Sequence, residues 1–178
     1  DDLVTGVQTC ALPILAIFFA FQSPDIEVLG LTTVYGNVPV TMAAQNALTL
    51  CEIAGKDIPV TKGVGMPWVG PESTYAHFVH GEHGFGHIKP EAPKTELDPR
   101  SSAQFIVDMA RKYPGEVTIV ASGPLGNLAL ALRLERLPDQ RGDLLVADRP
   151  RAAGTRLVVE PWNALGPVAL APDPDGGP

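Results

Sequence analysis

One run of residues, 26–34, constrains the fold of this chain more than any other segment. Its sequence is Ile-Glu-Val-Leu-Gly-Leu-Thr-Thr-Val, which is mostly apolar and rich in β-branched residues. A strand with this composition is covered on both faces, and such strands are typical of parallel sheets that carry helices on each side. The run therefore predicts an α/β fold.

Helical patterns lie on both sides of this strand. Residues 14–22 are apolar nearly all round, which predicts a buried helix that begins near Pro13. Thr41 is the predicted N-cap of the next helix, whose apolar residues recur at spacings of three and four until Gly55, where a C-terminal cap is expected. A short strand is expected at 58–60, at a sheet edge or a strand start because it contains a proline.

The alternation continues in the next part of the chain. Ser101 and Gln104 have capping-box spacing and predict a helix. Residues 116–121 predict a buried strand, and a further helix follows the turn at 123–124. The apolar face expected for that helix comprises Leu125, Leu128, Ala129 and Leu132. This order of elements predicts a mainly parallel sheet flanked by helices, with right-handed crossovers.

Composition divides the 178 residues into three parts. Residues 15–136 are the predicted domain. Residues 137–178 are rich in Pro and Gly and lack periodicity, so we expect a loosely attached tail. Residues 1–14 are an aberrant segment. The part from 4 to 14 resembles a translated sequencing adaptor, and the tail resembles a frame-shifted reading of GC-rich DNA. Both interpretations are hypotheses that resequencing of the source DNA tests.

Charge and cysteine content limit the expected partners and location. The chain has 13 basic and 20 acidic residues, a net charge of −7, and no basic run. A nucleic acid or an anionic membrane is therefore not an expected partner. The longest apolar stretch, 10–21, is too short to span a bilayer, and no basic residue precedes it as in a signal peptide. Only Cys10 and Cys51 are present, which predicts a reducing compartment. With the short apolar stretch, this leads us to expect a soluble, cytoplasmic protein.

A long stretch between 62 and 100 has many Gly, Pro and His residues and little periodicity. Loops of this length are usually functional or disordered. The stretch contains all four histidines of the chain, His77, His80, His83 and His87. Imidazole is the commonest metal ligand in proteins, although the intervening glycines predict a loop and not an aligning helix. Two interpretations stay open: a non-catalytic metal- or ligand-binding α/β module, or a loop whose histidines contact ligand or solvent separately.

Two more polar residues follow predicted strands, where ligands collect in α/β sheets. Asn37 comes after the strand at 26–34, and its amide could hydrogen-bond a polyol or close an Asx turn. Ser122 could cap the next helix or turn its carbonyl toward a ligand. No G-x-S-x-G elbow is present, so a Ser-His-Asp hydrolase is not indicated.

Several blocks together resemble the inosine/uridine-preferring nucleoside hydrolase family, in the order and at the approximate spacing of that family. The blocks are 15–24, 26–39, 46–48, 79–86 and 115–129. The resemblance implies a nucleoside hydrolase-like, truncated α/β domain. It also implies a calcium-dependent N-ribohydrolase that cleaves a ribonucleoside into ribose and free base, within a family-type homo-oligomer. Which nucleoside it prefers does not follow from these blocks.

The resemblance implies roles for three residues. Asn37 matches a substrate-contacting Asn of the family. His80 matches the His of its H-G-x-x-G segment, near the sugar. Ser122 matches a position, usually Thr, whose backbone carbonyl binds Ca²⁺, and a Ser fits there because only the backbone is used.

The chain also departs from the family pattern. The family motif D-x-D-P-G-x-D-D does not precede Leu15, and only Asp1 and Asp2 are similar to its Asp pair. Asp2 is therefore the candidate carboxylate for the metal, and no residue is assigned as the catalytic base. Nothing in 137–178 matches the second half of the family domain. We expect this chain to hydrolyse nucleosides weakly or not at all.

Overall fold

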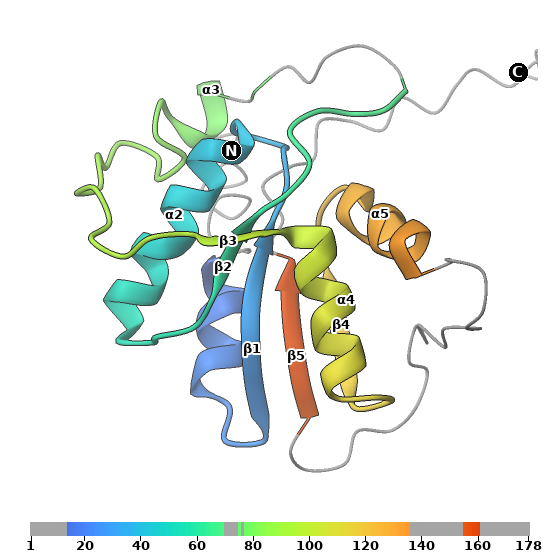
Figure 1. Ribbon diagram of the computed structural model, residues 1–178. Coiled ribbons are helices and arrows are strands. Elements are labelled where there is room, and N and C mark those ends of the chain that lie inside the picture. The colour runs from blue at the N-terminus through green and yellow to red at the C-terminus, as the bar shows by residue number, and fades with distance from the viewer. Residues whose placement is uncertain (1–13, 70–74, 76, 136–154, 161–178) are drawn as a thin grey trace, which may run out of the picture.

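The computed structural model describes residues 14–69, 75, 77–135 and 155–160, which form a three-layer α/β structure (Figure 1). Its five strands make one sheet in the order β3-β2-β1-β5-β4, and every pairing is parallel. The strands are β1 (Ile26–Thr33), β2 (Val60–Lys62), β3 (Asp98–Ser101), β4 (Val117–Ala121) and β5 (Thr155–Glu160). The predicted parallel sheet flanked by helices is confirmed.

Helices cover both faces of this sheet. A helix at 14–22 and α2 (Val40–Ala54) pack on one face, in a core that includes Leu31 of β1. On the other face, α4 (Ser102–Lys112) and α5 (Gly126–Glu135) pack in a second core. The remaining described helix, α3 (His77–His80), is one turn long and lies between β2 and β3. Among the described residues, no helix has the length and apolar character needed to cross a membrane.

The strand predicted from its composition lies where both faces are covered. Leu31, Thr32 and Thr33 of β1 are at most 1% exposed. Gly30 allows α4 to approach this strand, because a Cβ at that position would lie 2.6 Å from the Phe105 ring and 2.8 Å from the Pro59 carbonyl oxygen. The mostly apolar composition of this run is thus explained by burial on both sides of the second half of β1.

β5 corrects the expectation of a loosely attached C-terminal tail. Thr155–Glu160 pairs with β1 on one side and β4 on the other, so it lies inside the sheet. Leu157, Val158 and Val159 are at most 4% exposed and contribute to both cores. Six residues are too few to establish a period, and the surrounding Pro- and Gly-rich composition hid the strand. The rest of 137–178 lies outside the described residues.

The start of α2 differs from the prediction and its end agrees with it. The N-cap is Pro39, in an extended conformation, and Thr41 lies exposed within the first turn. Proline fixes its own φ, so the chain turns into the helix two residues earlier than a Thr cap requires. Gly55 closes the helix with a left-handed φ of 62°, as predicted, and β2 begins at Val60, later than expected.

Two predictions for the second half need correction. β4 is an edge strand whose five residues are all only half-buried, not buried as expected. The buried residues of α5 are Asn127 and Ala131, whereas Leu125 precedes the helix and is 57% exposed.

The predicted cap of α4 is confirmed, because the Ser101 hydroxyl accepts a hydrogen bond of 3.2 Å from the Gln104 N–H.

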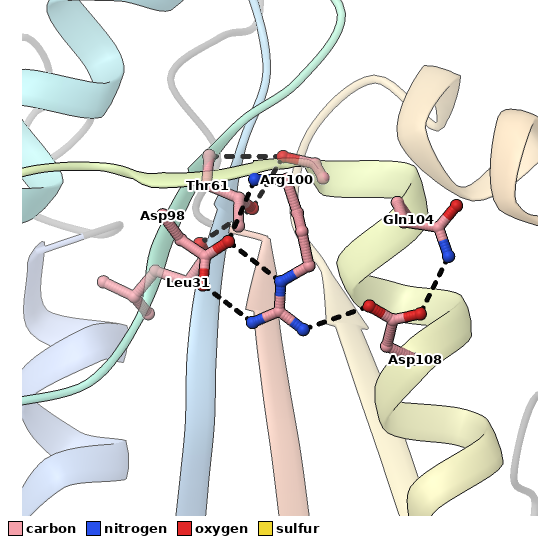
Figure 2. A network of polar contacts seen from close by, with 7 residues as sticks. Leu31, Thr61, Asp98, Arg100, Gln104 and Asp108 are labelled. Atoms are coloured by element: carbon pink, nitrogen blue, oxygen red, sulfur yellow. Dashed lines mark hydrogen bonds and ion pairs between the residues drawn. The ribbon is translucent and has the colours of Figure 1, made fainter.

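An unpredicted ion pair joins β3 to α4 (Figure 2). The Arg100 guanidinium donates to both carboxylate oxygens of Asp98, at 2.9 and 2.7 Å, and to Asp108 of α4 at 3.1 Å. The Gln104 amide donates to the other oxygen of Asp108 at 2.8 Å. Arg100 also lies 4.8 Å from the centre of the Phe105 ring. The edge strand β3 is thereby fixed to the helix that follows it.

Candidate functional site

All the strands of this sheet run in the same direction, so their carboxyl ends meet at one edge. The segments that follow β1, β2 and β4 at this edge contain Asn37, the long 62–100 stretch and Ser122. Figure 1 shows α3 at the same end of the molecule. Ligand sites of open α/β sheets lie outside this edge, which makes it the candidate site.

Asn37 belongs to a tight turn after β1. The Gly36 N–H donates to the Val38 carbonyl at 3.2 Å, and the Tyr35 N–H donates to the Val64 carbonyl at 3.0 Å. Asn37 itself is 4% exposed. Its amide carries donors and an acceptor in a position fixed by the backbone around it, which suits recognition of sugar hydroxyls.

His80 ends α3 and begins a compact loop. Its carbonyl accepts a 2.9 Å hydrogen bond from the Gly86 N–H, and Gly81, Gly84 and Gly86 all have positive φ values of 66–77°. Such values suit glycine and give the loop its closed shape. The His80 side chain is 5% exposed, and desolvation by burial lowers its pKa below the ordinary value of 6.5. The imidazole is therefore neutral at pH 7.

The histidine loop lies on α2 and beside the Asn37 turn. The Asn46 amide donates to the His83 carbonyl at 2.9 Å. Gly84 faces the same place, since a Cβ there would be 2.8 Å from the Asn46 amide nitrogen and 3.1 Å from Val38. The loop of His80 and the turn of Asn37 are thus brought to one region. Asn46 opens the 46–48 block of the family resemblance, but no role was predicted for it, because it is one polar residue beside an apolar helical stripe.

The turn after β4 is joined to the same edge through Asn127. Ser122 is half-buried in that turn, and Asn127 follows it in the first turn of α5. Asn127 is fully buried and makes hydrogen bonds to the Thr33 carbonyl at 2.9 Å and the Val64 N–H at 2.8 Å. These bonds connect the end of β4 with the ends of β1 and β2.

The described residues do not make up a calcium site. No group of three or more His, Cys, Asp or Glu side chains that could hold a metal ion occurs in the described part of the chain. Asn37 and the Ser122 carbonyl offer neutral oxygens, whereas Ca²⁺ sites rely on carboxylates. Asp2, the expected carboxylate, lies outside the described residues.

The four histidines do not form a metal centre either. All four lie within the described residues, where no metal-binding group of three is found. His77 and His87 are exposed, while His80 is buried. The described residues therefore give the metal-binding interpretation of this loop no geometric support, and the interpretation in which the histidines contact ligand or solvent separately stays a prediction.

The single described cysteine has no nucleophilic character. Cys51 is free and 3% exposed in the core beneath α2. Burial, with a smaller contribution from Glu52, raises the pKa of its thiol to about 12. Because the thiolate is the reactive form, Cys51 has a packing role.

Known proteins similar to this chain are nucleoside hydrolases. Uridine nucleosidase 1 of Arabidopsis thaliana is 49% identical over 120 residues, which are 67% of this chain and 36% of that protein. The inosine-uridine preferring nucleoside hydrolase of Leishmania major is 40% identical over 155 residues, 85% of this chain and 49% of that protein. The chain thus spans less than half the length of these relatives.

Solved structures give the same result. A plant nucleoside hydrolase aligns with a TM-score of 0.66 and 35% identity, over 82% of this chain and 43% of that chain. A purine-preferring ribonucleoside hydrolase from Gardnerella vaginalis aligns with a TM-score of 0.64 and 27% identity, over the same shares. The family model for inosine-uridine preferring nucleoside hydrolases matches residues 13–145. The chain therefore belongs to the inosine-uridine preferring nucleoside hydrolase family.

Proposed function

We propose that this chain binds the ribose of a ribonucleoside at the carboxyl edge of its sheet and takes part in hydrolysis of the N-glycosidic bond. One observation carries the proposal: the loop of His80 lies against Val38, next to the buried Asn37. Family membership supports the same substrate class. The hydrogen bonds of Asn127 bring the Ser122 turn to this edge and add further support.

In the proposed reaction, water adds to C1′ of the ribose as the bond from C1′ to the base nitrogen breaks. The base leaves with the bonding electron pair and takes up a proton, so the products are ribose and free base. The Asn37 amide would hydrogen-bond ribose hydroxyls, and the neutral His80 ring has one donor and one acceptor nitrogen. The described residues do not include an identified base for the water.

Calcium is the proposed metal, and the Ser122 carbonyl is one proposed ligand. Its carboxylate ligands would have to come from outside the described residues, and Asp2 is the candidate in this chain. Loss of one placed catalytic group commonly lowers the rate by about 10²–10⁴-fold. We therefore expect weak turnover or none.

Substrate binding is tested by titrating the full chain, labelled with ¹⁵N, with inosine, uridine and ribose. We expect saturable shifts of the Asn37 side-chain amide signals. The Asn37→Ala variant should lose binding, and Gln45→Ala, an exposed change on α2, should retain it. Absence of binding for all three compounds would contradict the proposal.

Turnover is tested separately by ribose release from inosine and uridine with added calcium. We expect release close to that of a boiled control. Robust calcium-dependent release that Asp2→Ala abolishes would contradict the expected weak activity. It would show that the first residues complete a metal site.

A further inference from the structure

A buried asparagine spans three segments at the carboxyl edge. Asn127 is fully buried at the start of α5. Its Oδ1 accepts a 2.8 Å hydrogen bond from the Val64 N–H, and its Nδ2 donates to the Thr33 carbonyl at 2.9 Å. Thr33 ends β1, and Val64 lies just beyond β2. One amide side chain thus links the ends of two strands to the helix that follows a third.

The two bonds require an amide at position 127. One atom must accept from a backbone N–H and the other must donate to a backbone carbonyl, which a carboxylate or an aliphatic side chain cannot do. Loss of these bonds would leave the half-buried Val64 N–H without this acceptor and would leave the Thr33 carbonyl with only the longer, 3.5 Å bond from the Ser102 hydroxyl, and unmade bonds of this kind are costly. The orientation of the Asn127 amide is fixed by the same complementarity.

The surrounding backbone is shaped around this side chain. A Cβ at Gly63 would overlap both polar atoms of Asn127 and the Thr33 carbonyl oxygen. The Val64 carbonyl also accepts a 3.0 Å hydrogen bond from the Tyr35 N–H. The segments after β1 and β2 are therefore joined twice, once directly and once through Asn127.

We propose that Asn127 is a positioning residue that holds the Asn37 turn and the Ser122 turn in fixed relation within the nucleoside site. The inference rests on the proposed function, because Asn37 and Ser122 are its sugar-binding and metal-binding candidates. Asn37 follows Thr33 closely in the chain, and Ser122 closely precedes Asn127. Asn127 acts through these segments and does not itself touch the substrate.

The test uses the full chain with Asn127→Leu, which keeps the branched shape and the number of side-chain heavy atoms and removes both hydrogen bonds. The matched control is Ala131→Gly, one turn further along the buried side of α5, which weakens the helix and leaves both bonds in place. Amide hydrogen exchange is measured at Tyr35 and Val64. Inosine and uridine affinity is measured at temperatures that give equal folded fractions.

In Asn127→Leu, we expect Tyr35 and Val64 to exchange about tenfold faster or more, relative to core amides such as Leu48. Nucleoside affinity should fall by about tenfold or more, as for loss of one or two buried hydrogen bonds. Ala131→Gly should raise exchange evenly and retain the affinity of the unchanged chain. Equal local exchange in the two variants, or unchanged affinity in Asn127→Leu, would overturn the inference.

The experiment also covers two further cases: an unchanged chain that binds no nucleoside, and an Asn127→Leu variant that does not fold. If the unchanged chain binds no nucleoside, the proposed function fails, and the exchange measurement still decides whether Asn127 fixes the two turns. If Asn127→Leu does not fold, Gly63→Ala replaces it, because its Cβ displaces the Asn127 amide and the Thr33 carbonyl from each other without removing either group. Gly65→Ala is its control, since a Cβ there would lie 3.3 Å from Val40 and away from Asn127. Equal exchange and affinity in this second pair would likewise overturn the inference.

Discussion

The carboxylate of Glu52 accepts two hydrogen bonds from Thr95, one from its N–H at 2.8 Å and one from its hydroxyl at 2.9 Å. The Lys94 N–H donates to the same oxygen at 2.6 Å. These bonds attach the segment before β3 to the last turns of α2. Led by the Thr95 backbone bond, they lower the pKa of Glu52 below its ordinary value of 4.5.

Glu52→Gln is expected to loosen this attachment. A carboxylate whose pKa is lower in the folded protein than in the unfolded chain stabilises the fold at pH values above the unfolded-state pKa. This contribution is lost as the pH falls through the folded-state pKa. The free energy of unfolding of the unchanged chain, measured in urea, should therefore fall below about pH 4.5. That of Glu52→Gln should fall less over the same pH range. Glu96→Gln, an exposed change on the same segment, is the control. Identical pH profiles for Glu52→Gln and the unchanged chain would contradict the prediction.

Asp98→Asn should lower the free energy of unfolding by about 1 kcal/mol, because it weakens a two-bond pair with Arg100 that is only partly shielded from water. The Arg100 hydrogen bond lowers the pKa of Asp98 below its ordinary value of 3.8, so the contribution is lost as the pH falls through the folded value. A double-mutant cycle with Arg100→Gln at pH 7 and pH 3 measures the coupling. Coupling that is zero at pH 7 would refute this account.

Leu157→Ala is expected to destabilise the chain by about 2–5 kcal/mol, as for large-to-small changes in a packed core. Leu157 is 3% exposed and packs with α2 and the 14–22 helix. Leu125→Ala, at a 57% exposed position, should change stability little. Thermal or urea unfolding measures both. Equal, small effects would mean that residues 155–160 do not lie inside the sheet.

His80 should make stability depend on pH near neutrality. Burial lowers its pKa below 6.5, so the unfolded chain takes up a proton before the folded one. Stability is then greatest above pH 6.5 and falls as the pH drops toward the folded value. His80→Phe should flatten this part of the profile, and His87→Gln, at an exposed position, should not. A steep slope that persists in His80→Phe would assign the effect elsewhere.

Segments with a long, consistent pattern were predictable. β1 followed from a mostly apolar, β-branched run, and α2 from its helical periodicity and Gly55, because burial on fixed faces imposes those patterns. β5 was missed because six residues establish no period, and β3 because it begins Asp-Pro-Arg within a polar stretch. In these cases the neighbouring strands select the conformation, which no local signal reports.

The candidate site was only partly visible in the sequence. Asn37 and Ser122 could be named because each follows a predicted strand. Asn127 could not, because its role depends on Thr33 and Val64, which are far from it in the chain. Its apolar neighbours suggested a leucine face for α5, whereas the helix buries the asparagine.

The position of β5 in the sheet also determines when the sheet can be completed during synthesis. β1, β2 and β4 leave the ribosome well before residues 155–160, yet β5 is the strand that joins β1 to β4. Until β5 is made, the edges of β1 and β4 that pair with it lack this partner. Unpaired strand edges favour association between chains. Pairings such as Ile26 with Thr155 also close a very long loop, which slows folding. Nascent chains of this protein are therefore expected to need chaperone protection until β5 has been made.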